Sequence, residues 1–232
     1  MKRPPRLYFS FRSPYTWMAV HKLRWSIPDL FEVAEWFPYW DPDPDTERAM
    51  LDQGAQLPYQ AMSKAKHLYV LGDTKRLAGR LGLEMAWPVD VDPWWEVPHL
   101  AWLAARRLGA AQRCYDALVA ARWQRGENIC DRAVLRRVVA DAGLPADLLD
   151  AAVDDPEVRA EGVGCLVAAY EDDVFGVPYL RLGRQRFWGF DRVEMFLDAY
   201  HDAAGSGADP MHGVPAAVPA GGYDRDTAGG CG

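Results

Sequence analysis

The chain alternates between short apolar runs and longer segments with helical spacing. Residues 6–11 are mostly aromatic and aliphatic, which is typical of a buried strand. Ser13 and Pro14 follow as an N-cap residue and a proline suited to the first helical position. Apolar residues then recur at helical spacing to about residue 25, and residues 31–37 predict a second strand that ends at Pro38.

Residues 46 to about 170 are almost entirely helical in pattern. Strand-like residues return at 176–182 and 185–188, joined by a tight turn at Gly183, and a last helix is predicted at about 191–203. The helices predicted between the strands cover about 63–81, 98–108, 112–123, 132–142, 146–154 and 156–172. This order predicts an α/β fold with a large all-helical insertion.

The same pattern divides the chain into three parts. Residues 1–45 and 171–204 are predicted to form the α/β domain, and residues 46–170 the inserted helical domain. Residues 205–232, dominated by Gly, Ala, Pro and Ser, predict a flexible tail.

Composition excludes several classes of protein. Half of the 232 residues are apolar and a quarter are charged, an ordinary balance for a folded chain. A net charge of −7 without a long Lys/Arg run argues against binding nucleic acid or an anionic membrane. No apolar run approaches the roughly 18 residues of a membrane span, and none follows the basic start as a secretion signal would require. We therefore expect a cytoplasmic protein.

The four cysteines are scattered. Cys114, Cys130, Cys165 and Cys231 form neither a zinc-ligand pattern nor a CxxC redox pair. We expect the first three to be free, mostly buried thiols, and we expect no bound metal.

Four sequence blocks carry a family resemblance. They are residues 8–15 with the motif Ser-Pro-Tyr, residues 66–76 leading to Gly82 and Pro88, the tripeptide Gly176-Val177-Pro178, and residues 187–192. In this order they resemble the 2-hydroxychromene-2-carboxylate isomerases and the related kappa-class glutathione transferases of the DsbA-like thioredoxin-fold superfamily. The resemblance implies a thioredoxin-like fold with a helical insertion, a cis-trans isomerase and a homodimer. The excess of Arg over Lys suggests a bacterial source.

Ser13 is the candidate catalytic residue. In a thioredoxin fold, the turn after the first strand places a side chain at a helix N-terminus, where unpaired N–H groups favour negative charge. The chain has Ser13 and Thr16 at the two redox positions, so disulfide exchange is excluded there. A serine can instead hydrogen-bond the sulfur of an external thiol and lower its pKa. The simpler alternative is that Ser13 only caps its helix, and the two roles are compatible.

The resemblance also implies a thiol-binding site. Val177 and Pro178, with a cis peptide bond, would offer backbone groups to the cysteinyl part of glutathione, and Asp191 beside Phe190 would hold its γ-glutamyl part. The alternatives are a trans proline at a strand start and a plain N-cap at Asp191. Phe190, Ser10 and residues 53–57 depart from the family pattern, so the cofactor is glutathione or another low-molecular-weight thiol.

The supply of aromatic residues predicts a broad apolar pocket for a small, conjugated or aromatic substrate. We expect His67 and His99 to be structural or solvent-exposed. The residues expected to line the pocket are Arg12, Tyr15, Tyr39, Trp40 and Trp188.

These observations predict a thiol-dependent cis-trans isomerase, in which the bound thiolate adds to a conjugated alkene and is expelled after rotation. Three alternatives stay open. One is a double-bond isomerase of a natural-product polyene, free or bound to a carrier protein, that uses no free glutathione. The others are a kappa-like glutathione S-transferase and a non-catalytic thioredoxin-fold binding module.

Overall fold

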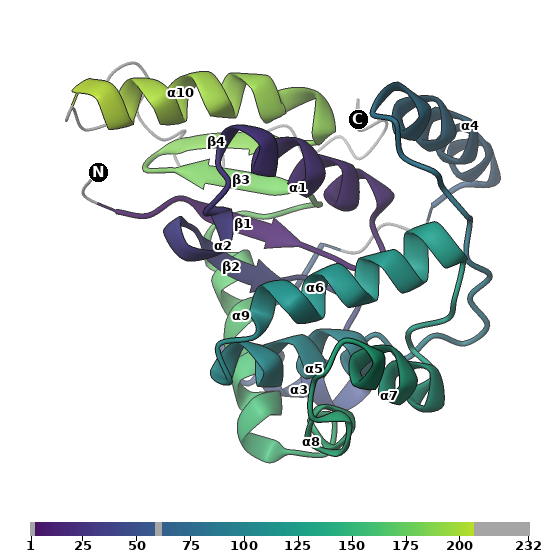
Figure 1. Cartoon of the computed structure of the whole chain (residues 1–232). Coiled ribbons are helices and arrows are strands. Elements are labelled where there is room, and N and C mark those ends of the chain that lie inside the picture. Colours follow the sequence, from purple (N-terminus) through teal and green to yellow (C-terminus); the bar gives the residue numbers. More distant parts are fainter. Residues whose placement is uncertain (1–2, 59–61, 207–232) are drawn as a thin grey trace.

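Four strands form one mixed sheet in the order β2-β1-β3-β4 (Figure 1). The structure is a computed structural model that describes residues 3–58 and 62–206. Strand β1 (Arg6–Phe9) pairs in parallel with β2 (Glu35–Pro38). On its other side β1 pairs antiparallel with β3 (Tyr179–Leu182), which continues into the antiparallel β4 (Gln185–Trp188).

Two helices pack together on one face of the sheet. Helix α1 (Pro14–Ser26) connects β1 towards β2, and α10 (Val193–Ser206) follows β4 through the short 3-10 helix η2 (Phe190–Arg192). Figure 1 shows α10 lying beside α1 above the strands. Leu7 of β1 and Leu180 of β3 lie opposite each other and are both buried, since directly opposed residues of neighbouring strands share one face of the sheet.

Most of the other helices form a block between β2 and β3. One continuous cluster of buried residues includes Phe9 of the sheet and Trp102 and Leu166 of the helices, so the block shares its core with the sheet. Figure 1 shows α5, α6, α7 and α8 gathered below the strands, with α9 running from them back towards the sheet. The elements are α3 (Pro44–Leu51), α4 (Lys64–Arg80), α5 (Glu96–Arg107), α6 (Ala111–Val119), the π-helix η1 (Ala120–Gln124), α7 (Arg132–Asp141), α8 (Ala146–Ala151) and α9 (Pro156–Glu171). The predicted α/β fold with a helical insertion is confirmed.

The strand predicted over residues 31–37 is wrong in its first half. Leu30–Val33 instead form the short helix α2, in which the N–H groups of Glu32 and Val33 donate to the Asp29 carbonyl at 2.8 and 3.1 Å. The turn brings the ring of Phe31 onto Trp36, with centroids 4.1 Å apart. This stacking and the backbone bonds favour the helical turn over strand propensity.

Three of the four cysteines are described, and all three are free and buried, as predicted. Cys231 and nearly all of the predicted flexible tail lie outside the described residues, while Gly205 belongs to α10. Within residues 3–58 and 62–206 no helix has the length and hydropathy needed to cross a membrane. The same residues contain no group of His, Cys, Asp and Glu side chains suited to a metal ion.

Candidate functional site

Ser13 lies at the turn between β1 and α1. Its N–H donates to the Ser10 carbonyl at 3.1 Å, which closes the turn. Its hydroxyl Oγ accepts from the N–H of Thr16 at 3.2 Å, so Ser13 is the N-cap of α1, with Pro14 at the first helical position. The strand, the cap and the proline therefore fix the position of the hydroxyl.

The Ser13 hydroxyl also reaches the loop before β3. Its Oγ donates to the carbonyl oxygen of Val177 at 3.4 Å, and the Val177–Pro178 peptide bond is cis. A hydroxyl has one proton to donate and two acceptor sites, so capping the helix leaves that proton available. The structure thus brings Ser13 and Val177 together, and a ligand atom between them would compete for the same proton.

His99 of α5 holds the turn from behind. Its Nε2 accepts from the N–H of Phe11 at 3.2 Å and lies 3.4 Å from the Ser10 hydroxyl, and its Nδ1 lies 2.7 Å from the Trp95 carbonyl. A carbonyl can only accept, so Nδ1 carries the proton and Nε2 is the acceptor. Burial lowers the pKa of His99 to about 3, which keeps the ring neutral.

The structural role predicted for His99 is therefore confirmed by its full burial. Sequence reasoning missed that this histidine binds the turn carrying Ser13. The position of His99 inside an apolar helix could have indicated this contact, since a buried imidazole needs hydrogen-bond partners. His67 was predicted to be either structural or solvent-exposed, and it is exposed on α4.

Asp191 and Phe190 lie on η2, which packs against α1. Gly189 before them has a φ of 95°, and a Cβ there would stand 2.8 Å from Asp191 Oδ1, so glycine is required at this position. Asp191 is exposed and forms an ion pair with Arg192 at 2.6 Å. The ring of Phe190 faces the ammonium group of Lys22, 5.5 Å from its centroid.

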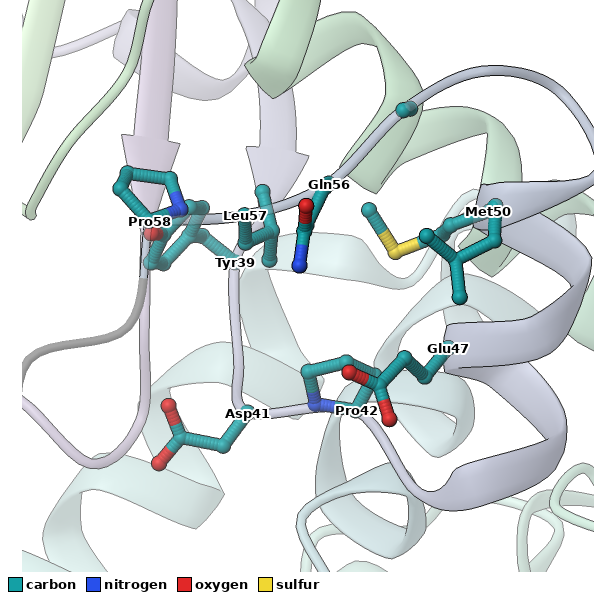
Figure 2. Close-up of a pocket in the computed structure, with 10 residues that line it drawn as sticks. Tyr39, Asp41, Pro42, Glu47, Met50, Gln56, Leu57 and Pro58 are labelled. Carbon is teal, nitrogen blue, oxygen red and sulfur yellow. The ribbon is translucent and has the colours of Figure 1, made fainter.

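A cavity of about 350 Å³ opens after the end of β2. Figure 2 shows Tyr39, Leu57 and Pro58 along one side of it and Met50 and Glu47 of α3 along the other. The sequence predicted only Tyr39 as a lining residue, because the remaining wall depends on how α3 packs. Burial raises the pKa of the Tyr39 hydroxyl, so this group stays protonated at neutral pH.

A second cavity of about 300 Å³ adjoins the first, and both are lined by Asp41 and Pro42. Arg12 lines the second cavity, where it forms an ion pair with Asp41 and lies over the ring of Trp95, 6.0 Å from its centroid. Arg12 follows β1 and Asp41 follows β2, and parallel strands end at one edge of a sheet. The ion pair therefore joins the Ser13 turn to the two cavities.

The other residues predicted to line a substrate pocket line neither cavity. The Tyr15 hydroxyl donates to Asp73 of α4 at 2.8 Å. Burial is the main cause that raises the pKa of Tyr15, and this hydrogen bond is the second. Trp40 is buried and stacks on His99 with centroids 5.1 Å apart, so it belongs to the core. Trp188 is half-buried on β4, packed against Phe175 with centroids 4.8 Å apart.

Comparison with known protein families gives a match over most of the chain. Residues 6–201 match the model of the DSBA-like thioredoxin domain. The chain belongs to the DsbA-like thioredoxin family. It is 30% identical over 199 residues to the 2-hydroxychromene-2-carboxylate isomerase of Sphingobium xenophagum, across 83% of this chain and 95% of the relative. This DsbA-family kinship supports an enzyme of the isomerase class.

Solved structures show the same fold. A 2-hydroxychromene-2-carboxylate isomerase superposes with a TM-score of 0.69 at 21% identity, covering 89% of this DsbA-like chain and 98% of the other. The cytosolic disulfide reductase DsbM from Pseudomonas aeruginosa, solved with GSH, has a TM-score of 0.56 at 15% identity, covering 86% of this chain and 100% of that one.

Proposed function

We propose that this protein is a thiol-dependent cis-trans isomerase of a conjugated or aromatic substrate. The observation that carries the proposal is the Ser13 hydroxyl at a helix N-terminus with its proton directed to the Val177 carbonyl at 3.4 Å. A thiol sulfur bound between these residues would take that proton as a hydrogen bond and would face the positive end of the α1 dipole. Both effects stabilise the thiolate.

The three cysteines that the structure describes do not suit the role of this sulfur. Burial raises the pKa of the Cys114 and Cys130 thiols to about 12 and that of Cys165 to about 11, so these thiols stay protonated and unreactive. In this proposal a low-molecular-weight cofactor supplies the reactive thiolate at Ser13.

Groups on η2, which packs against α1, suit the ends of glutathione. The exposed Asp191 carboxylate suits an amino group, and the N–H groups of η2 and the start of α10 suit a carboxylate. DsbM, a structural neighbour, was solved with GSH. The Asp191–Arg192 ion pair is exposed, so opening it costs little.

The reaction follows from these groups. The thiolate adds to one alkene carbon, and the π electrons move into the conjugated system. The former double bond is now single and rotates. The electrons then return, the carbon–sulfur bond breaks, and the thiolate leaves unchanged with the isomerised product. Ser13 holds the sulfur throughout, and the cofactor is the nucleophile.

The decisive experiment compares Ser13→Ala with Ser63→Ala. Ser63 is the N-cap of α4 and accepts from the Lys66 N–H at 3.2 Å, so both variants lose a helix cap of about 1 kcal/mol. Conjugated E and Z substrates are followed by chromatography with and without glutathione and other small thiols. We expect thiol-dependent turnover that falls about 100-fold in Ser13→Ala and persists in Ser63→Ala.

The same experiment separates the alternatives. Turnover without thiol that survives in Ser13→Ala would favour the polyene isomerase, free or on a carrier protein. Accumulation of a stable thioether would indicate a glutathione S-transferase. Thiol binding without turnover would indicate a binding module.

A further inference from the structure

The charge of the cavity beside the Ser13 turn points to a substrate class. We infer that this enzyme takes a neutral or cationic conjugated substrate in preference to a carboxylate, an inference that rests on the proposed function. The 2-hydroxychromene-2-carboxylate isomerases that this chain resembles are named for a substrate with a carboxylate. The inferred substrate preference therefore distinguishes this chain from them.

The cavity of about 350 Å³ is linked to the proposed thiol site through shared packing. Tyr39 and Leu57 line it. Both pack against the same small cluster of buried residues as Val177, whose carbonyl accepts from the Ser13 hydroxyl. The N–H of Tyr39 donates to the Phe9 carbonyl at 2.7 Å, which continues the β1–β2 pairing to the sheet edge where the Ser13 turn begins. In this inference a substrate in the cavity reaches the sulfur from the end of β2.

The inner wall of the cavity is apolar. Met50 and Ala55 are 2% and 1% exposed, and Tyr39 and Leu57 are half-buried around them. Such a surface favours the flat hydrocarbon part of a conjugated molecule.

The charged groups of the cavity are all acidic. Its lining contains Asp41 and Glu47, both exposed, and no Lys, Arg or His side chain among the described residues. Asp41 is neutralised by its ion pair with Arg12. Glu47 has no ion-pair partner in the described part of the chain, so the rim carries a net negative charge.

The adjoining cavity does not reverse this charge. Its cation, Arg12, already binds Asp41. Asp43 on the same wall is held by Arg159 at 2.7 Å, and this arginine lies outside both cavity linings. Glu47 would consequently repel a substrate carboxylate, with no unpaired cation in the two linings to offset the repulsion. A neutral amide would not be repelled, and a protonated amine would be attracted.

The test measures binding of three probes that share a styryl group and carry a negative, neutral or positive end: cinnamic acid, cinnamamide and cinnamylamine. Isothermal calorimetry at pH 7 and low salt gives their Kd for the full chain and for Glu47→Gln. The control is Glu32→Gln, since Glu32 is an exposed glutamate on α2, which precedes β2, whereas the cavity follows β2. We expect the amine to bind about fivefold more tightly than the acid, with the amide between them.

Glu47→Gln should reduce the amine-to-acid ratio about threefold, and Glu32→Gln should leave it unchanged. Three results would overturn the inference: the acid binds as tightly as the amide, the amine-to-acid ratio in Glu47→Gln equals that of the parent protein, or no probe binds. These measurements need no thiol and no turnover, so they can fail while the Ser13→Ala comparison succeeds, or the reverse.

Discussion

The imidazole Nε2 of His99 accepts a hydrogen bond from the backbone N–H of Phe11, 3.2 Å away. The two residues come from different parts of the fold, His99 from α5 of the helical block and Phe11 from the turn that carries Ser13. The helical block therefore does more than cover the sheet, because one of its side chains satisfies a buried backbone donor two residues from the candidate catalytic hydroxyl.

His99→Phe tests this support. Phenylalanine keeps an aromatic ring against Trp40 and removes both nitrogens, so the Phe11 N–H is left buried without its acceptor. We expect the free energy of unfolding to fall by about 1–3 kcal/mol in urea denaturation. The control is His67→Phe on the exposed side of α4, expected within about 0.5 kcal/mol of the parent protein. Equal stabilities of the two variants would contradict the role of His99.

The pKa of His99 predicts a pH dependence of stability. Burial lowers this pKa to about 3 in the folded chain, against about 6.5 when unfolded. As the pH falls below about 6.5, His99 binds a proton in the unfolded chain but stays neutral in the folded chain until about pH 3. The free energy of unfolding therefore decreases between pH 6.5 and pH 3.

The measurement is urea unfolding at pH 6 and pH 4 for the parent protein and for His99→Phe. The parent should lose about 2 kcal/mol more than the variant between these two pH values. Identical losses would show that His99 is protonated in the folded chain, contrary to its neutral state here.

Much of the architecture is readable from the sequence for local reasons. Aromatic runs mark the strands, and Ser13 with Pro14 marks the start of α1. The cavity is not readable in this way, because its wall depends on the placement of α3. That placement is set by contacts between distant residues, such as Arg159 of α9 with Asp43 at 2.7 Å. Such pairings are not encoded in local periodicity, so Glu47 and Met50 were missed while Tyr39 was found.

Gly176→Ala probes the loop that faces Ser13. A Cβ at Gly176 would lie 2.8 Å from Trp188 Nε1 and 3.4 Å from its Cε2, so the indole or the loop has to move. We expect a loss of about 1–3 kcal/mol in stability and a higher KM for the thiol, since Val177 follows directly. Adding Trp188→Phe should restore both, because the clashing indole atoms are then absent.

The control for this change is Gly164→Ala on the exposed side of α9, where a Cβ meets nothing within 4 Å. There alanine should be neutral or stabilising by up to about 1 kcal/mol through its helix propensity. A Gly176→Ala protein with unchanged stability and KM would mean that the loop accommodates the methyl group without moving Val177.

The ability of the Ser13 turn to stabilise a thiolate can be measured directly with Ser13→Cys. In a Cys231→Ser background, the pH dependence of iodoacetamide alkylation, followed by mass spectrometry, reports the pKa of the new thiol. We expect it about 1–2 units below the usual 8.5, because the Thr16 N–H and the α1 dipole both face this position. The pKa values of about 12, 12 and 11 for Cys114, Cys130 and Cys165 leave those buried thiols unmodified below pH 9.

The matched control is Ser26→Cys, at the exposed C-terminal end of the same helix. The negative end of the dipole should hold that thiol at or above its usual pKa. Two variants on one helix thus separate the effect of the N-terminus from that of solvent exposure. If the thiol at position 13 titrates no lower than the thiol at position 26, the turn gives no stabilisation to sulfur, and an external thiol would gain no reactivity by binding there.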